Sequence, residues 1–408
     1  MLNLFLKDNL IPIEDQPFEI VERKGLGHPD TLADGIAESI SIEYTDYCLN
    51  KFKAVLHHNV DKIAVIGGLG EFDFGYAKMK KPIKIILNGR MSESFGKTTI
   101  DIKEIQVSAT KKYIRKVLPF LDIQKWVNIL SFVSASSRNP VWFHPRTIDD
   151  LPELKSPYAN DTATIVSFWP LSCTEKIVLE CEKLFYNADL TPKFNFMGQD
   201  IKIMAIRQYK NLNLIMCIPF FAAKIHSAKE YEEKLKNLHK KLLNHLNNKF
   251  SNFKINLYLN TEDQRVKNKT TAKGYYFVIS GSALDYGEEG VAGRGNRSYG
   301  FISSVRPYSI ESVCGKNPVY HVGKVYTYIA DMLSKRIAIE LDCEVNVIIT
   351  TRNGDPLYNP HSLIVNISKK GEKTKIQQII TEELERRDWT EKIIKYKTFL
   401  PINNLQYE

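Results

Sequence analysis

The chain lacks the marks of a membrane, secreted or metal-clipped protein. In its 408 residues no apolar run approaches the roughly 20 residues that span a bilayer, and the N-terminus has neither a basic leader nor a small-residue cleavage site. Its six cysteines are scattered with no CxxC pair, which argues against a zinc site and a disulfide framework. We therefore expect a reduced, cytoplasmic protein with no membrane partner.

Acidic residues are in the minority, and the formal net charge is +9. This excess leaves three kinds of partner open: nucleic acid, a membrane surface, or a polyanionic small substrate. Much of it lies in Lys-rich helical stretches such as 229–241, and no stretch alternates Arg or Lys with stacking aromatics as single-strand binders do. We expect most of the charge on solvated surface and predict no nucleic-acid partner.

Strand-like and helix-like segments alternate along the chain. Apolar runs predict strands at 62–68, 82–90, 126–136, 162–170, 344–350 and 362–368, a hairpin at 201–222, and a strand pair at 254–260 and 274–280. Amphipathic runs predict helices at 29–52, 226–250 and 324–340, followed by two C-terminal helices. This order predicts an α+β architecture whose sheets are covered on one face by helices, with boundaries near 120 and 250.

The stretch VERKGLGHPDTLADGIAESI places turn-forming residues before an amphipathic run. Pro29 suits the first turn of a helix, whose N-terminus favours anions, while Asp30 can cap that helix or bind a cation. Asp30, Asp34 and Glu38 recur every fourth residue and therefore share one helix face. We expect function from His28 and Asp30, and for Asp34 and Glu38 a structural role on a capped, solvated helix face.

A second stretch, DYGEEGVAGRGNR at 285–297, combines four glycines with Arg294 and Arg297. Exposed backbone N–H groups and guanidinium forks suit phosphate, although the stretch is neither a P-loop nor a GxGxxG motif. A plain hairpin loop is the alternative. A third stretch, CGKNPVYHVGK at 314–324, adds Lys316 and Lys324. Together the two predict a polyphosphate site, to which Mg²⁺ would bind through one or two carboxylates and phosphate oxygens.

Seven motifs together resemble archaeal-type S-adenosylmethionine synthetases (methionine adenosyltransferases). They are VERKGLGHPD, DGIAES, LHHN, ANDT, DIKIMAIR, GVAGRGNR and GKNPVYHVGK. The resemblance implies three similar α+β sub-domains: 1–120 with GHPD, 121–250 with ANDT and DIK, and 251–408 with GRGNR and GKNP, interleaved in space. It also implies at least a homodimer with active sites between subunits, ATP and L-methionine as substrates, two Mg²⁺ ions, and K⁺ as an activator.

The resemblance also implies catalytic and metal-binding residues. His28, Lys202 and Arg294 would be catalytic, with His28 hydrogen-bonding the leaving oxygen or the first phosphate. Asp30 would hold Mg²⁺, and Glu288 or Glu289 would be the second metal-binding carboxylate.

Further residues would bind the substrates. Arg294, Arg297, Lys316 and Lys324 would bind the triphosphate, and Asp161 the methionine ammonium. Asp200 and Lys202 would bind the ribose hydroxyls and the region between phosphate and methionine. His57, His58 and Asn59 either contribute to a monovalent-cation site or form a packed strand end.

The implied reaction is sulfur attack on ribose C5′ of ATP, followed by hydrolysis of the released triphosphate to pyrophosphate and phosphate. The chain departs from the family at Glu288-Glu289, where aspartates are usual, and at 133–139, where a GQGS-like loop is usual. Two alternatives therefore stay open: a divergent member that acts on another thioether, and a non-catalytic ATP-binding subunit.

Overall fold

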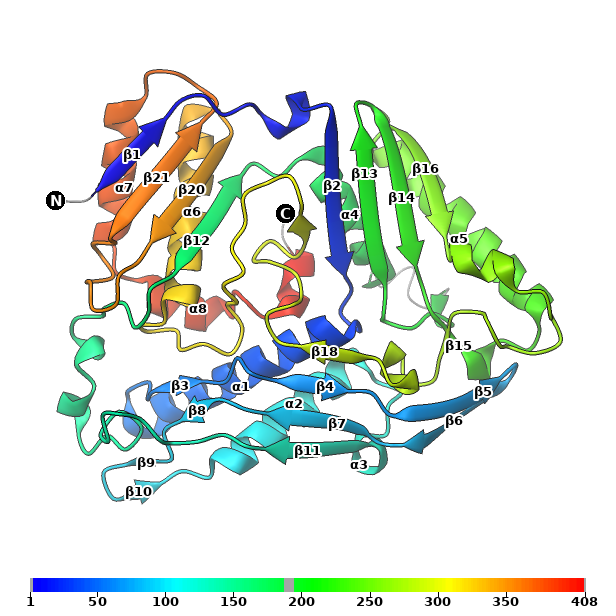
Figure 1. The fold of residues 1–408 in the computed structure, drawn as a ribbon, viewed down its shortest axis with the longest axis horizontal. Coiled ribbons are helices and arrows are strands. Elements are labelled where there is room, and N and C mark those ends of the chain that lie inside the picture. Colours follow the sequence, from blue (N-terminus) through cyan, green and yellow to red (C-terminus); the bar gives the residue numbers. More distant parts are fainter. Residues whose placement is uncertain (1–2, 187–193, 407–408) are drawn as a thin grey trace.

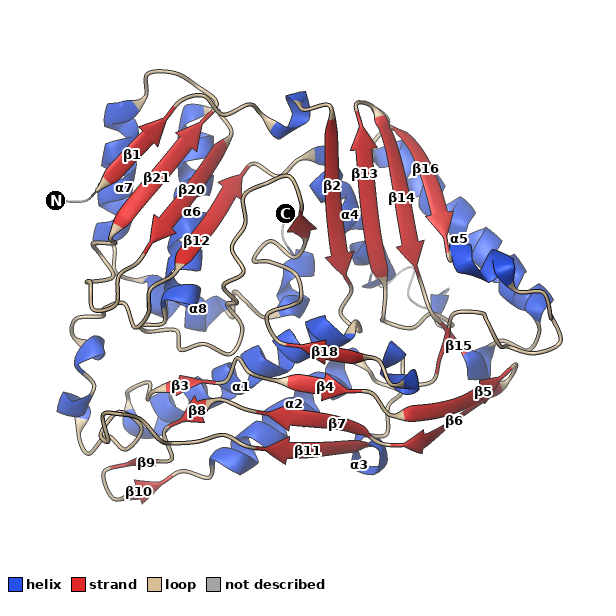
Figure 2. Cartoon of the chain, viewed as in Figure 1, coloured by secondary structure: helices blue, strands red, loops and turns tan. Residues whose placement is uncertain are grey.

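The computed structural model describes residues 3–186 and 194–406. In Figure 1 three sheets stand in front and the long helices stand behind them. Figure 2, in the same view, shows that loops join the sheets into one layer of strands backed by one layer of helices. We call them the lower, right and left sheets after their places in these figures.

The lower sheet has the strand order β11-β7-β4-β18. Helix α1 (Pro29–Phe52) packs on β4 and β18, and helix α2 (Ile102–Val117) packs on α1. Alternate residues of β7 enter the core between sheet and helices, because successive strand side chains point to opposite faces. The strands are β11 (Val127–Ser131), β7 (Ile83–Leu87), β4 (Ala64–Ile66) and β18 (Glu289–Val291).

The right sheet has the order β16-β14-β13-β2-β19. Helix α4 (Cys173–Lys183) packs on β2 and β13, and begins with a capping box between Ser172 and Glu175. Helix α5 (Ala228–Lys249) packs on β16. The strands are β16 (Lys254–Leu259), β14 (Asn211–Cys217), β13 (Lys202–Gln208), β2 (Phe18–Lys24) and β19 (Ile302–Ser303).

The left sheet has the order β1-β21-β20-β12. Helix α6 (Val322–Leu341) packs on β12 and β20, and helices α7 (Lys373–Glu385) and α8 (Trp389–Tyr396) pack on α6. The strands are β1 (Leu4–Lys7), β21 (Ser362–Ile367), β20 (Val345–Thr350) and β12 (Thr164–Trp169).

Shorter elements complete the described chain. The paired strands are β3 (His58–Asn59) with β8 (Arg90–Met91), β5 (Leu69–Asp73) with β6 (Tyr76–Lys81), β9 (Ser94–Phe95) with β10 (Thr98–Thr99), and β15 (Phe220–Phe221) with β17 (Phe277–Val278). Helix α3 (Ile123–Trp126) precedes β11. None of the described helices is long and apolar enough to cross a membrane.

The faces of the sheets that point away from the helices carry apolar rows that cross all four strands of the lower and left sheets. In the lower sheet the row is Leu130, Ile86, Ala64 and Val291. In the left sheet it is Phe5, Ile364, Ile348 and Val166. Leu130, Val291 and Phe5 are exposed within the chain. Each of these two faces therefore carries an apolar row that the chain alone does not cover.

The predicted α+β class is confirmed, as are the helix at 29–52 and the hairpin at 201–222. The strand pair predicted at 254–260 and 274–280 is wrong. Strand β16 pairs in parallel with β14, because α5 crosses over between them, whereas β17 pairs with β15. The division at 120 and 250 stays a prediction, and each large sheet contains strands from all three ranges.

Candidate active site

Helix α1 begins against the segment that leads into β13. His28 is its N-cap, and its Nδ1 accepts a hydrogen bond from the Asp30 backbone N–H at 3.2 Å. Just before it, the Gly27 N–H donates to the Gln199 carbonyl at 2.9 Å. A Cβ on Gly27 would lie 2.5 Å from the carbonyl carbon of Gln199, so this approach requires glycine. The GHPD and DIK motifs are therefore in direct contact.

A cavity of about 650 Å³ lies beside this contact, and we call it the His28 cavity. Four residues predicted for the site line it: His28, Asp200, Lys202 and Glu288. Lys202 Nζ lies 3.3 Å from Glu22 Oε1 on the neighbouring strand. Segments 260–263 and 274–276 form another wall. Residues far apart in the sequence thus converge on one concave surface.

Burial sets the protonation of two groups in the His28 cavity. It lowers the pKa of His28 to about 4, so the imidazole is neutral at pH 7. Burial also raises the pKa of Asp200 to about 7, and the charge of Glu288 acts in the same direction. Against this, Asp200 accepts a hydrogen bond from the Ala283 N–H at 2.8 Å. A cation entering the cavity would keep Asp200 ionised.

A second cavity, of about 550 Å³, is cationic, and we call it the Arg294 cavity. Two carboxylates line it, Asp61 and Glu311, and both are near Lys316: its Nζ pairs with Glu311 and lies 3.8 Å from Asp61 Oδ2. The positively charged residues outnumber them: Lys24, Lys62, Arg294, Arg297 and Lys316. Such a surface suits a polyanion.

An ion pair links Lys24, which lines the Arg294 cavity, to Asp30, which follows His28 and Pro29 of the His28 cavity. Lys24 Nζ lies 2.8 Å from Asp30 Oδ2 and donates to the Arg294 carbonyl at 2.7 Å. The other carboxylate oxygen, Asp30 Oδ1, accepts the Val291 N–H at 3.0 Å. Burial raises the pKa of Asp30, but the bonds from Lys24 and Val291 outweigh burial and hold the pKa below its usual value. The start of α1 is therefore tied to the glycine-rich loop.

Asp34 supports the glycine-rich loop from beneath. Its Oδ1 accepts the Gly293 N–H at 2.7 Å, and a Cβ on Gly295 would lie 2.1 Å from its Oδ2. Burial raises the pKa of Asp34 to about 7. Arg297 folds back onto the same loop and donates to the carbonyls of Gly293 and Gly295 at 2.9 and 3.0 Å. The solvated helix face expected for Asp34 is wrong, because the carboxylate is buried beneath the loop that it supports.

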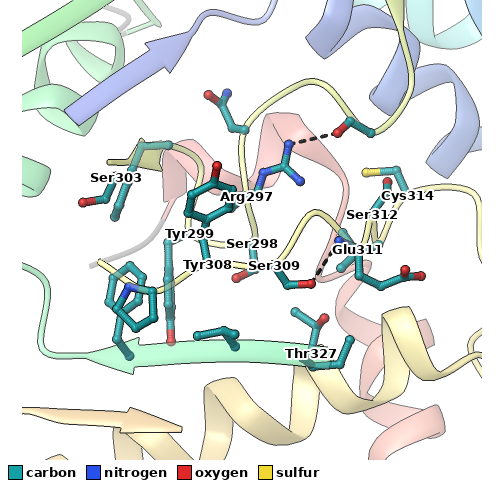
Figure 3. A pocket seen from close by; sticks show the side chains of 18 of the residues that line it. Arg297, Ser298, Tyr299, Ser303, Tyr308, Ser309, Glu311, Ser312, Cys314 and Thr327 are labelled. Carbon is teal, nitrogen blue, oxygen red and sulfur yellow. Dashed lines mark hydrogen bonds between the residues drawn. The ribbon is translucent and has the colours of Figure 1, made fainter. Parts of the chain in front are cut away.

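Arg297 also borders a third, much smaller cavity of about 50 Å³. Figure 3 shows its guanidinium beside Tyr299, with Thr327 on the opposite wall. This space is too small for a nucleotide, so the two larger cavities form the candidate site.

Glu38, further along α1, is fully enclosed. Lys324 Nζ lies 2.9 and 2.8 Å from its two oxygens, and the Gly315 N–H donates to Oε2 at 3.0 Å. Both side chains are 2% exposed. The solvated helix face expected for Glu38 is therefore wrong, because α6 and the 314–316 segment cover this side chain. Lys324, expected to bind phosphate, lines neither of the two larger cavities, and its charge is neutralised by Glu38.

Three other predicted residues also line neither cavity within the single chain: Asp161, Glu289, and Asp30, which pairs with Lys24. Asp161 is exposed, and its Oδ1 accepts the Thr162 N–H at 2.8 Å. Glu289 is exposed at the start of β18. Of the carboxylate pair at 288–289, only the first therefore faces the His28 cavity.

The two histidines of LHHN form a packed strand end. His58 is buried, with Nε2 2.8 Å from Ser41 Oγ and Nδ1 3.0 Å from the Leu56 carbonyl. His57 is buried too, pairs with Glu153, and has Nδ1 2.5 Å from the Trp142 carbonyl. These partners favour the structural alternative over a cation site.

Across residues 3–186 and 194–406, no group of three or more His, Cys, Asp and Glu side chains is placed to hold a metal ion. The donors near the cavities are nevertheless of the right chemistry for Mg²⁺, which takes one or two carboxylates together with phosphate oxygens. Asp30 pairs with Lys24 of the Arg294 cavity, and Asp200 and Glu288 face the His28 cavity. The residues present therefore fit Mg²⁺ that arrives with a polyphosphate.

Sequence reasoning missed Lys24 and Glu311. Lys24 was visible in VERKGLGHPD, since strand alternation places it on the same face as Glu22 and in register with Lys202. Glu311 lies in a loop with no periodic pattern, so its contact with Lys316 depends on the tertiary fold.

Comparison with known proteins gives one family. A family model described as S-adenosylmethionine synthetase (AdoMet synthetase) matches residues 6–397. An uncharacterized protein of Streptococcus pyogenes serotype M3 is 36% identical over 394 residues, which cover 95% of each chain. The S-adenosylmethionine synthase of Pyrococcus furiosus is 35% identical over 350 residues, covering 86% of this chain and 85% of its own. That of Caldivirga maquilingensis is 34% identical over 389 residues, covering 92% and 93%.

A solved structure has a similar fold. It is described as an unusual S-adenosylmethionine synthetase from Campylobacter jejuni, and its TM-score is 0.62 at 15% sequence identity. The match covers 94% of this chain and 90% of that one.

Proposed function

The chain belongs to the S-adenosylmethionine synthetase family and is an enzyme of that family, and from this premise we propose that it converts ATP, L-methionine and water to S-adenosylmethionine, phosphate and pyrophosphate. The observation that carries the proposal is the pair of adjoining cavities. The Arg294 cavity suits the triphosphate, and the His28 cavity has room for the adenosyl and methionine groups. Lys24 lines the Arg294 cavity and pairs with Asp30, which follows His28 and Pro29 of the His28 cavity, so we place the C5′–O bond that breaks near this pair.

In the first step the methionine sulfur attacks C5′, the C5′–O bond breaks, and its electron pair leaves on the triphosphate. Sulfur becomes a sulfonium, so negative charge grows only on the leaving group. The cations of the Arg294 cavity are in place to stabilise that charge before the bond breaks, which is electrostatic preorganisation. Arg294 and Lys316 would carry most of this role, with Lys202 bordering from the other side.

His28 would act as a hydrogen-bond donor. Its pKa of about 4 keeps it neutral, and its Nδ1 accepts the Asp30 N–H. A neutral imidazole that accepts at Nδ1 carries its proton on Nε2. His28 would therefore donate from Nε2 to the leaving oxygen, as the resemblance implies.

Members of this family generally use Mg²⁺ and K⁺. Bound Mg²⁺ would neutralise phosphate charge, and Asp30, Glu288 and Asp200 are the carboxylates that would hold it. Glu289 and Lys324 have no part in this assignment.

We also propose that the enzyme is a homodimer whose open sheet faces meet. The apolar rows of the lower and left sheets support this, because contiguous exposed apolar surface marks an interaction site. Four residues that line the cavities lie on the open face of the right sheet: Lys202, Cys217, Lys24 and Ile302. A second copy on that side would complete both cavities and could supply the exposed Asp161.

Charge in the lower row would separate the subunits. We expect Ile86→Glu with Leu130→Glu to shift the protein from dimer to monomer in sedimentation equilibrium. The control is Lys103→Glu with Arg115→Glu, at exposed positions of α2 on the helix side of the same sheet. If the Ile86 and Leu130 variant sediments like the unaltered protein, the dimer lies elsewhere.

The test of function is direct. Purified protein is incubated with ATP, L-methionine, Mg²⁺ and K⁺, and S-adenosylmethionine, pyrophosphate and phosphate are measured. We expect all three in equal amounts. Phosphate release without sulfonium would indicate another thioether substrate, and ATP binding without either product would indicate a non-catalytic subunit.

A further inference from the structure

The Lys24 ammonium is bound to the Asp30 carboxylate, which in the proposed function holds a metal ion. Its Nζ lies 2.8 Å from Asp30 Oδ2 and 2.7 Å from the Arg294 carbonyl. Both side chains of the ion pair are 12% exposed, so the pair is sheltered but reachable from the cavity. In the substrate-free chain, the Lys24 ammonium therefore already neutralises the Asp30 carboxylate.

The two oxygens of Asp30 differ in what holds them. Oδ1 is bound by the Val291 N–H of strand β18, which the sheet fixes. Oδ2 is bound by the end of a four-carbon side chain with rotatable bonds. Oδ2 is therefore the oxygen that can be released without moving the backbone.

The backbone of Lys24 stays in place when its side chain moves. Its N–H donates to Asn296 Oδ1 at 3.0 Å, and Asn296 Nδ2 donates to its carbonyl at 2.7 Å. Thr31 Oγ1 donates to the same carbonyl at 3.1 Å. Lys24 also lines the Arg294 cavity, so a change of rotamer would carry its charge from Asp30 toward a bound polyphosphate.

We propose that Lys24 is a positioning residue that competes with the divalent cation for Asp30. In the substrate-free enzyme its ammonium holds Oδ2 and keeps metal affinity low. When metal and polyphosphate arrive together, the metal takes Oδ2 and the ammonium pairs with a phosphate oxygen. The inference rests on the proposed function for the identity of the polyphosphate.

This exchange couples the two ligands. Metal binding frees Lys24 for the phosphate, and the phosphate removes Lys24 from the metal's ligand. Linkage requires each to raise the affinity for the other by the same factor. The device would stop the enzyme from holding a bare metal ion in the absence of nucleotide.

The test measures Mn²⁺ binding to the substrate-free protein by electron paramagnetic resonance, with no turnover involved. We expect Lys24→Met to bind Mn²⁺ at least about tenfold more tightly than the unaltered protein, because removal of a nearby positive charge favours a cation. Lys24→Gln, which keeps a donor for the Arg294 carbonyl without the charge, carries the same expectation if the first variant fails to fold. Circular dichroism checks that each variant is folded.

The matched control is Lys62→Met, since Lys62 lines the same cavity but pairs with Asp61. It should change Mn²⁺ affinity much less than Lys24→Met. Adding Asp30→Asn to Lys24→Met should abolish the gain. Tripolyphosphate should tighten Mn²⁺ binding in the unaltered protein far more than in Lys24→Met.

Equal Mn²⁺ affinity in the unaltered protein and both folded Lys24 variants would overturn the proposal. So would an equal gain in Lys62→Met, since the effect would then be one of general charge. Failure of the proposed function is seen separately, as absence of S-adenosylmethionine, because the Mn²⁺ titration needs neither ATP nor methionine.

Discussion

Helix α1 carries two lysine–carboxylate pairs of similar length in different surroundings. At its first turn, Lys24 meets Asp30 at 2.8 Å with each side chain 12% exposed. Two turns on, Lys324 meets Glu38 at 2.8 Å with each side chain 2% exposed. Lys24 of the first pair lines the Arg294 cavity, whereas the carboxylate oxygens of the second pair are bound by Lys324 and the Gly315 N–H. Lysine–carboxylate pairs on one helix face thus have two roles: the Lys24–Asp30 pair can exchange its cation, whereas the Lys324–Glu38 pair stabilises the fold.

The difference teaches that an ion pair is defined by what surrounds it. Removing one partner of a buried, fully hydrogen-bonded pair strongly lowers the free energy of unfolding, because the remaining charge stays in a low-dielectric site. A pair at the edge of a cavity can replace its partner with water or a ligand. Asp34 lies midway between the two pairs. It is buried like Glu38, but it accepts a hydrogen bond from Gly293 of the loop that lines the Arg294 cavity.

The largest expected effect is at the enclosed pair. Lys324→Met leaves Glu38 buried without its counter-ion and should lower the free energy of unfolding by about 3–5 kcal/mol. The matched change Lys24→Met should lower it by no more than about 1 kcal/mol. Urea unfolding followed by circular dichroism measures both. Equal losses would erase the distinction between the two pairs.

The next largest effect is on kcat and concerns His28, the N-cap residue of α1. His28→Ala removes a donor to the leaving oxygen and should lower kcat by about 10²–10³-fold. ATP binding should stay within about tenfold, because the contact is made mainly in the transition state. Radiolabelled methionine measures the rate, and calorimetry measures binding. His239→Ala on α5, whose ring contacts the Leu257 carbonyl away from both cavities, should leave kcat unchanged. A parallel fall in kcat and ATP affinity would contradict this role.

A smaller effect is expected for Asp34. Its pKa rises from 3.8 to about 7 on folding, so between these values the folded chain holds a proton that the unfolded chain lacks. Stability due to this group is therefore present at low pH and is lost as the pH rises toward 7, by at most about 1.4 kcal/mol per pH unit. Asp34→Asn mimics the protonated acid and should flatten the dependence of unfolding free energy on pH between 4 and 7. An unchanged slope would mean that Asp34 ionises normally.

Much of the candidate site could be predicted because its residues occur in short motifs. His28 with Asp30, Asp200 with Lys202, and Arg294 with Arg297 are each close in sequence, and local chain geometry keeps them together. Lys324 was assigned to phosphate because its stretch adds a second cationic cluster soon after the arginine–glycine loop, and because the family resemblance implies it. The register of helix α6 turns it inward toward Glu38 instead, and nothing in the local sequence records that neighbour.

The sequence by itself determined three local elements: the helix at 29–52 with its capped start, the hairpin at 201–222, and the glycine-rich loop whose composition suits phosphate. It also carried the family resemblance. Only the tertiary structure decided which lysine meets which carboxylate, that β16 pairs with β14, and that every large sheet draws strands from the whole chain. The physical reason is range. Capping, periodicity and turn chemistry act over a few residues, whereas burial and charge pairing join distant segments, such as Glu38 and Lys324, which are 286 residues apart.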